Sequence, residues 1–187
     1  VSTATAEMLL VKLFFNSIIS TKNARFMTID IKNFYLGTPM KRKEYMKVKL
    51  RHIPLDIQQQ YNLKDLVTPD GYIFIMINKG MYGLRNAAIL AYDNLKRNLK
   101  PFGYHPIEGS TGLWTHNTRR TRFCLCVDDF GLKFYTKDDA QHFLKALGTH
   151  YNYTVDWSGT NYCGLTFSWH YREGYVDVAM PNYIQKA

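Results

Sequence analysis

The order of its patterned segments constrains the fold of this chain more than any other feature. From Phe26 onward, apart from an insert between Thr38 and Lys79, periodicity predicts strand, helix, strand, strand, helix and strand. This order is the split βαβ arrangement, in which a right-handed crossover makes the first two strands parallel. The predicted class is therefore α+β with an antiparallel sheet. The predicted segments are a strand at 26–36, a helix at 86–99, a hairpin at 123–135, a helix at 136–147 and a strand at 162–169.

Other segments are predicted around this order. A helix at 4–19 precedes it, and a strand at 175–180 follows as the partner of 162–169. The insert is expected to hold a basic, partly extended stretch at 41–52, a short helix at 54–66 and a strand at 72–77. Thr136 and Asp139 form a predicted capping pair at the start of the helix at 136–147.

Three aspartates are predicted to meet at one edge of this sheet. Asp30 interrupts an apolar strand, where an unpaired charge is costly, and Asp128 and Asp129 lie at the tip of an apolar hairpin. Adjacent carboxylates repel one another unless a cation lies between them. Oxygen ligands of this kind suit Mg²⁺ or Mn²⁺, and two such ions about 4 Å apart support phosphoryl transfer. The alternative is an ordinary Asp-Asp turn, and the apolar strands on both sides favour the metal site.

Bulk properties narrow the class of partner. The formal charge of +9 favours a polyanion, with a merely solvated basic surface as the alternative. Three cysteines, two of them only two positions apart, fit a reducing, intracellular setting. The apolar stretch at 8–15 is too short to span a bilayer, so no membrane partner is expected. Because the first residue is Val, we interpret the chain as a piece of a longer product.

Four ordered segments resemble the reverse transcriptase of copia-type LTR retrotransposons. DIKNFYL at 30–36 is similar to the family's first acidic motif, and KGMYGLRNA at 79–87 to its lysine-x-leucine-tyrosine-glycine-leucine motif. CVDD at 126–129 is similar to the tyrosine-valine-aspartate-aspartate box, and YCGL at 162–165 to the tyrosine-x-leucine-glycine stretch. The resemblance covers nearly the whole chain. It implies a polymerase palm with partial fingers, and RNA- and DNA-templated DNA synthesis from deoxynucleoside triphosphates.

The resemblance also implies roles for single residues. Asp30, Asp128 and Asp129 are expected to be the catalytic ligands of two Mg²⁺ ions (Mn²⁺ being possible), with the backbone of Ile31 beside them. Tyr35 takes the position of an aromatic gate whose ring would clash with a 2′-hydroxyl, with ordinary packing as the alternative. Asn86 stands where the family has a glutamine that contacts the incoming nucleotide. The expected nucleic-acid contacts are Lys41, Arg42, Lys43, Lys79, Gly83 and Arg85.

The basic residues at 41–43 can contact backbone phosphates, and a solvated loop is the alternative. Gly80 and Gly83 are expected to allow close approach of the template, or simply a turn.

Several departures from the family pattern favour a second interpretation. Asn86 is one methylene shorter than glutamine, Cys126 replaces a tyrosine beside the acids, and neither Thr154 nor Val155 supplies the lysine often proposed as general acid. The alternative is a catalytically inactive or domesticated fold that only binds nucleic acid. A nuclease using the same acids would want a histidine near them, and these motifs contain none.

The resemblance further implies partners and organisation. The partners would be an RNA or DNA template–primer, the triphosphates, and the integrase and ribonuclease H domains of the same polyprotein. The setting would be a cytoplasmic virus-like particle or the nucleus. Fingers-like parts are expected at 1–24 and 38–78, and the palm at 25–37 and 79–187. Because only Lys12, Lys22 and Arg25 are basic before Asp30, this segment alone is expected to polymerise weakly.

Overall fold

The computed structural model describes residues 6–84, 86–110 and 112–181. The chain divides into two compact units. The larger unit comprises Val1–Phe34 and Ala91–Ala187, and the smaller unit comprises Tyr35–Leu90.

The larger unit is built on a six-stranded sheet with the order β4-β5-β6-β7-β1-β8. Every neighbouring pair is antiparallel, so β1 and β6 run parallel, as the crossover rule predicted. The order β6-β7-β1-β8 around the central strands is that of a split βαβ unit. The strands are β1 (Arg25–Ile31), β4 (Tyr104–Pro106), β5 (Leu113–His116), β6 (Arg122–Cys126), β7 (Asp129–Phe134) and β8 (Tyr153–Asp156).

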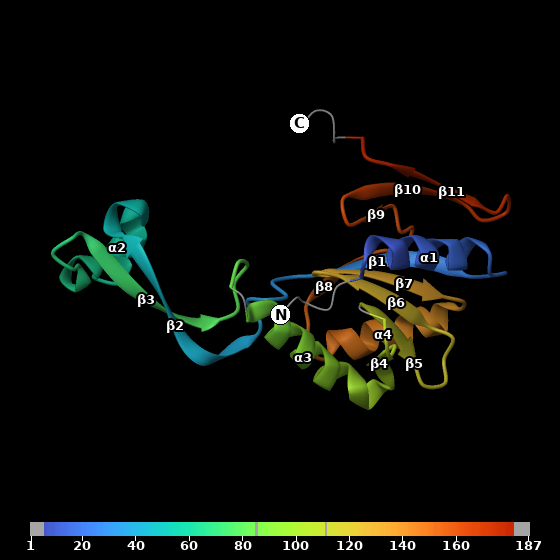
Figure 1. Ribbon diagram of the computed structural model, residues 1–187, viewed down its shortest axis with the longest axis horizontal. Helices are drawn as coiled ribbons and strands as arrows, with labels where there is room; N and C mark the ends of the chain where they lie inside the picture. Colours follow the sequence, from blue (N-terminus) through green and yellow to red (C-terminus); the bar gives the residue numbers. More distant parts are fainter. Residues whose placement is uncertain (1–5, 85, 111, 182–187) are drawn as a thin grey trace. The chain divides into compact units, whose positions relative to one another are not determined.

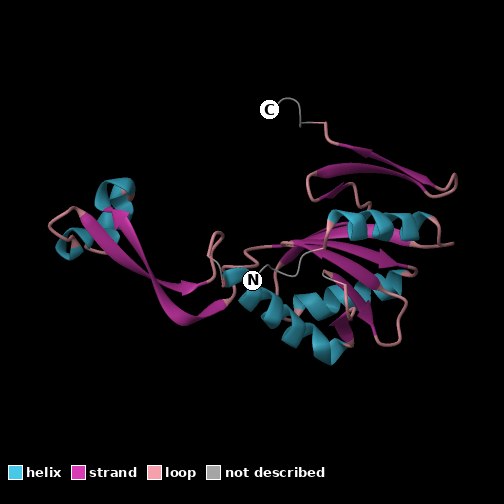
Figure 2. Ribbon diagram, in the orientation of Figure 1, coloured by secondary structure: helices cyan, strands magenta, loops and turns pink. Residues whose placement is uncertain are grey.

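Helices cover both faces of this sheet (Figures 1 and 2). Helix α1 (Met8–Ile19) lies on one face, and α3 (Ala87–Leu99) and α4 (Lys137–Gly148) lie on the other. A short 3₁₀ turn, η3 (Lys100–Phe102), follows α3. On the α1 side, the aromatic ring of Phe15 packs against the rings of Phe26 and Phe167, with centroid distances of 5.5 and 4.7 Å. This aromatic cluster joins α1 to both the sheet and the C-terminal strands.

The C-terminal strands form a second sheet of three strands in the order β11-β10-β9. They are β9 (Asn161–Tyr162), β10 (Leu165–His170) and β11 (Tyr175–Ala179). The prediction that 162–169 is the fourth strand of the main sheet is therefore wrong, since β8 pairs with β1 in that place. Only four residues long, β8 offers too little alternation for a periodicity argument to detect.

Two other segment predictions differ from the structure. Strands β4 and β5 were not predicted, because each is very short. The strand expected at 26–36 ends at Ile31, and the chain then turns through Asn33, which has a left-handed φ of 56°. Asparagine tolerates this conformation better than most residues do.

The smaller unit is a two-stranded ribbon of β2 (Pro39–Lys49) and β3 (Tyr72–Lys79). The connection between them contains η1 (Leu50–His52), α2 (Leu55–Gln60) and η2 (Leu63–Leu66). Buried Gln58 anchors this connection, because its side-chain amide donates to the carbonyls of Leu50 and Ile53 at 3.1 and 2.7 Å. The predicted grouping of 1–24 with 38–78 differs from this division, since α1 packs within the larger unit.

Candidate functional site

Two of the three predicted acids lie directly opposite one another. The register of β1 and β7 pairs Asp30 with Asp129. Cross-strand partners share a face of the sheet, with Cβ atoms about 5 Å apart. The carboxylates of Asp30 and Asp129 therefore leave the same face from two adjacent strands, at the edge where the topology predicted that they would meet.

Asp128 lies in the tight turn that leads into β7. Cys126 pairs with Asp129, so only Val127 and Asp128 form the turn of the hairpin. Val127 has a φ of 61°, which is a strained conformation for a β-branched residue. Glycine is usual at such a position. The hairpin thus carries backbone strain directly beside the acids.

The electrostatics of Asp129 reflect its neighbours. Burial raises the pKa of its carboxyl, and the charges of Asp128 and Asp30 raise that pKa further. A hydrogen bond with the thiol of Cys163 acts in the opposite direction. Asp129 consequently interacts with both other carboxylates, and an ionised Asp129 is costly in the absence of a compensating positive charge.

A pocket on this face brings further polar residues beside the acids. It is lined by both Asp30 and Asp129, and by Thr154 and Asn161. Thr154 is the β8 partner of Asp30, so its position follows from the unpredicted β8 strand. As the cross-strand partner of Asp30, Thr154 lies on the same face of the sheet as the acids.

Asp156 also lines this pocket, but its carboxylate is already engaged. It accepts hydrogen bonds from the backbone amides of Ser158 and Thr160 at 3.0 and 2.7 Å. Although burial alone would raise the pKa of Asp156, hydrogen bonds from these two residues lower it to about 2. Asp156 therefore stabilises the turn after β8.

The donors around the pocket suit a hard cation. Among the residues that the structure describes, no three histidine, cysteine, aspartate or glutamate side chains are arranged to hold a metal ion. Mg²⁺, however, usually takes only one or two protein carboxylates and completes its octahedron with waters and substrate phosphates. Asp30 and Asp129 supply that number of carboxylates from adjacent strands. The site therefore fits a metal that arrives with a phosphate ligand better than a permanently bound ion.

Two cysteine thiols are neighbours of Asp129: Cys126 is its cross-strand partner, and Cys163 is its hydrogen-bond partner. A hydrogen bond from the Cys163 thiol lowers the pKa of Cys126 to about 7. Cys163 has a left-handed φ of 51°, and it precedes β10. Cys126 is thus a half-buried cysteine that contacts a second thiol.

Tyr35 belongs to the smaller unit, where its ring is buried. It packs edge-to-face against Tyr82, with ring centroids 4.7 Å apart. A Cβ at Gly80 would come within 2.7 Å of the backbone oxygen of Tyr35, so only glycine allows this approach. Gly80 therefore serves packing within the unit, and the packing alternative for Tyr35 has direct structural support.

The remaining predicted residues are distributed over both units. Ile31 is buried opposite Tyr153 at the end of β1. Asn86 is exposed before α3, and Gly83 has a left-handed φ of 87° with open space around it. Arg85 lies outside the described residues. Lys41, Arg42, Lys43 and Lys79 are exposed on the β2–β3 ribbon.

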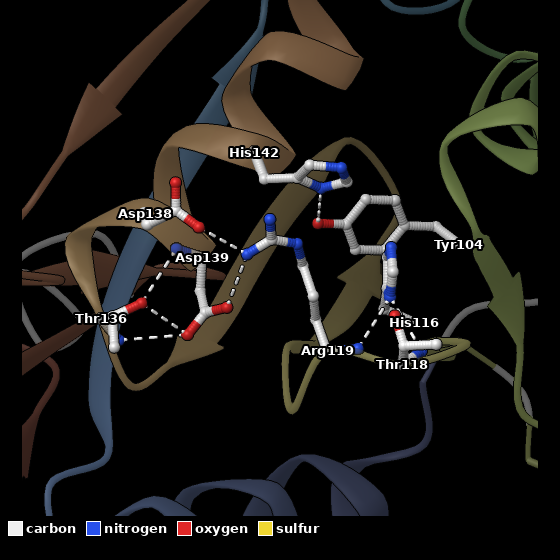
Figure 3. Close-up of polar contacts among 8 residues, drawn as sticks. All are labelled: Tyr104, His116, Thr118, Arg119, Thr136, Asp138, Asp139 and His142. Carbon is white, nitrogen blue, oxygen red and sulfur yellow. Dashed lines mark hydrogen bonds and ion pairs between the residues drawn. The ribbon is translucent and has the colours of Figure 1, made fainter.

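A second polar cluster joins β4 and β5 to the start of α4 (Figure 3). Arg119 bridges Asp138 and Asp139 at 2.7 and 3.0 Å, while Thr136 and Asp139 form the predicted capping box. The remaining members are histidine and tyrosine side chains. The Tyr104 hydroxyl lies 3.1 Å from Nδ1 of His142, and Nδ1 of His116 accepts from the backbone amides of Thr118 and Arg119.

Every member of this cluster has a partner within it. The cluster therefore stabilises the start of α4, and its described side chains are already paired with one another rather than arranged to bind a ligand.

No helix among the described residues is long and apolar enough to cross a membrane. Comparisons with protein-family models, with curated proteins and with solved structures gave no match. A functional assignment therefore depends on the residues and geometry of this chain itself.

Proposed function

We propose that the chain is the palm, with part of the fingers, of an RNA-directed DNA polymerase from a copia-type LTR retrotransposon polyprotein. The observation that carries this proposal is the pairing of Asp30 with Asp129, with Asp128 in the adjoining two-residue turn. The acids of two motifs, about 100 positions apart, thereby share one sheet edge, as the two-carboxylate chemistry of nucleotidyl transfer requires.

The reaction would extend a primer by one deoxynucleotide. The primer's 3′-hydroxyl loses its proton to water, and its oxygen attacks the α-phosphorus of the triphosphate. The bond from this phosphorus to the bridging oxygen breaks to release pyrophosphate. Two bound Mg²⁺ ions would activate the attacking oxygen and stabilise the leaving oxygen. Asp30 and Asp129 would hold these ions from adjacent strands of a rigid sheet, with Asp128 and the Ile31 backbone beside them.

The smaller unit would contribute substrate contacts. Lys41, Arg42 and Lys43 are exposed and would bind template–primer phosphates, together with Lys79 and the backbone at Gly83. Asn86 would contact the incoming nucleotide, and Tyr35 would limit the space for a 2′-hydroxyl. The remaining partners would be the integrase and ribonuclease H domains of the polyprotein, in a cytoplasmic particle or the nucleus.

The test is metal-dependent primer extension on a primed RNA template. We expect weak extension by this segment with Mg²⁺, stronger extension when the flanking segments are restored, and none with a chelator. In the extended protein, Asp30→Asn or Asp129→Asn should reduce extension by at least about a hundredfold, since transition-state charge stabilisation is removed. Asp65→Asn, an exposed aspartate in η2, is the matched control and should retain activity. Extension that persists in Asp30→Asn would contradict the assignment.

A catalytically inactive fold that only binds nucleic acid is the second candidate. It is favoured by the lack of a three-ligand metal group among the described residues, and by the Cys126–Cys163 thiol contact at the position of the family tyrosine. Nucleic-acid binding without extension, and without Mn²⁺ binding that depends on Asp30 and Asp129, would support this candidate over the polymerase.

A further inference from the structure

One face of the β2–β3 ribbon gathers aromatic and basic side chains. The register pairs Tyr45 with Met76, Lys47 with Phe74, and Lys49 with Tyr72. Because cross-strand partners share a face, all six side chains project to the same side. We call this set the stacking face; it comprises Tyr45, Lys47, Lys49, Tyr72, Phe74 and Met76.

The two faces of the ribbon differ in how much they bury. On the stacking face, Tyr45 is 61% exposed and Phe74 is 60% exposed. On the opposite face, Ile73 and Ile77 are buried. Ile73 and Ile77 therefore belong to the core of the smaller unit, while the rings of Tyr45 and Phe74 are exposed to solvent. Exposed large rings commonly mark an interaction surface.

The charges beside the open rings are positive. The ammonium group of Lys47 lies 4.2 Å from the Tyr72 ring centroid and 6.0 Å from that of Phe74, and the Lys49 ammonium lies 5.4 Å from the Tyr72 ring. The only acid in the two strands, Glu44, pairs with Ile77 on the opposite face.

Asp70, in the turn that precedes β3, forms an ion pair with Lys47 at 2.8 Å. Both side chains are exposed, so this ion pair holds Lys47 only weakly. Lys41, Arg42 and Lys43 continue the positive charge along β2. Flat apolar rings framed by ammonium groups complement a ligand that presents flat bases and regular phosphates together.

We propose that the stacking face binds single-stranded nucleic acid, with bases stacked on Tyr45 and Phe74 and phosphates held by Lys47 and Lys49. A duplex hides the faces of its bases within the stack, so only an unpaired strand satisfies both kinds of group. This inference deepens the nucleic-acid part of the proposed function, in which an unpaired template strand is a substrate. The proposed binding uses only residues of the β2–β3 ribbon, and Asp30 and Asp129 take no part in it.

The first experiment separates stacking from charge. Fluorescence anisotropy measures the affinity of the full chain for a labelled oligothymidylate and for an abasic strand of equal length. We expect Tyr45→Ala and Phe74→Ala each to weaken oligothymidylate binding about fivefold or more, and to leave abasic binding unchanged. The matched control is Tyr61→Ala, an equally exposed tyrosine at the end of α2, which should have no effect.

The second experiment uses salt. Lys49→Gln should reduce the slope of log affinity against log salt by about 0.7, as expected for one lost phosphate contact on a single strand. Tyr45→Ala should lower the affinity with no change in this slope. Circular dichroism of each variant checks that the ribbon remains folded.

Three results would overturn the proposal. Equal affinities for oligothymidylate, abasic strand and duplex would show that the face responds to charge alone. Unaltered binding by the Tyr45→Ala/Phe74→Ala double variant would place the strand elsewhere. Concentration-dependent self-association abolished by Tyr45→Ala, without oligonucleotide binding, would identify a protein interface instead.

The proposed polymerase can fail independently of this inference. Asp30→Asn should leave oligothymidylate binding intact, because Asp30 belongs to the larger unit. Strand binding without any primer extension would reject the polymerase and support the stacking face. Primer extension together with unaltered binding in the Tyr45→Ala/Phe74→Ala variant would support the polymerase and reject the stacking face.

Discussion

At the scale of single residues, the ionised carboxylate of Asp129 opposes folding. Asp129 is half-buried on β7, and burial together with the charges of Asp128 and Asp30 raises the pKa of its carboxyl. A side chain kept for stability alone would not be an acid here. Sites selected for chemistry commonly carry such a cost in stability.

Asp129→Asn should therefore stabilise the metal-free protein. The amide keeps the shape of the carboxylate and removes its repulsion with Asp128 and Asp30, so we expect an increase on the order of 1 kcal/mol, or about 2–4 °C in Tm. Thermal unfolding at neutral pH with a chelator present measures this. The matched control is Asp177→Asn, an exposed aspartate on β11 paired with His170. A destabilised Asp129→Asn protein would mean that the hydrogen bond between Asp129 and Cys163 outweighs the repulsion.

The strain at Val127 gives a second prediction. Val127→Gly removes the cost of a β-branched residue at a φ of 61°, about 1–2 kcal/mol, and adds a smaller entropic cost to folding. We expect the free energy of unfolding to rise by about 0.5–1 kcal/mol, as measured by urea denaturation. Val178→Gly, at a similarly exposed valine within β11, should lower it. Equal losses in both variants would show that Val127 is not strained.

The sequence predicts that the acids meet, but it does not predict which other side chains lie beside them. Asp30 and Asp129 could be predicted to meet because element order alone determines which strands are neighbours. Thr154 and Asn161 could not, because their placement depends on β8 and β9, which have four and two residues and too little pattern to detect. Cys163 belongs to the YCGL segment, and its contacts depend on a left-handed backbone conformation that a cysteine in a sequence does not predict.

At the scale of elements, the polar cluster at the start of α4 joins β5 to the helix (Figure 3). The capping box was predictable, because Thr136 and Asp139 have the local spacing that the motif requires. The contact between His116 and His142 could not be predicted, because it depends on the packing of β5 against α4. Their ring centroids lie 5.2 Å apart.

This cluster predicts a pH dependence of stability. Burial lowers the pKa of both His116 and His142, so the unfolded chain takes up protons more readily than the folded one. The stabilising contribution is complete above the unfolded pKa of about 6.5 and is lost as the pH falls below it. Urea denaturation between about pH 7.5 and 5 should show this decline.

A pair of variants tests the cause. Asparagine at position 116 can still accept from the amides of Thr118 and Arg119 but does not titrate, so His116→Asn should flatten the decline. His150→Asn, at an exposed histidine that follows α4, should leave the decline unchanged. Identical profiles for all three proteins would assign the acid sensitivity to other groups.

At the scale of the whole molecule, the two units differ in how their strands are secured. In the larger unit, β1 is hydrogen-bonded on both sides and packed by helices on both faces, whereas the smaller unit is a two-stranded ribbon. Ribbons of two strands have little stability of their own. The α+β class could be predicted from element order, while the separation into these units could not, because it depends on packing between distant segments.

Native-state hydrogen exchange should reveal this difference. Amides of β2 and β3 should exchange through local opening, far faster than amides of β1 and β7, which should require global unfolding. Addition of oligothymidylate should slow exchange in β2 and β3 selectively if the stacking face is occupied. Equal protection of the amides of β2, β3 and β1 without ligand would contradict this picture.

The central position of β1 also governs how the candidate site comes into being during folding. Neither of its neighbours, β7 and β8, is adjacent to it along the chain, so its pairing must close loops of about 100 residues or more. Such closure is slow, and local hairpin formation between β6 and β7 can precede it. The turn that carries Asp128 and Asp129 can thus form early, but Asp30 joins it only when the whole sheet is assembled. Formation of the acidic pair should therefore follow the slowest phase of refolding.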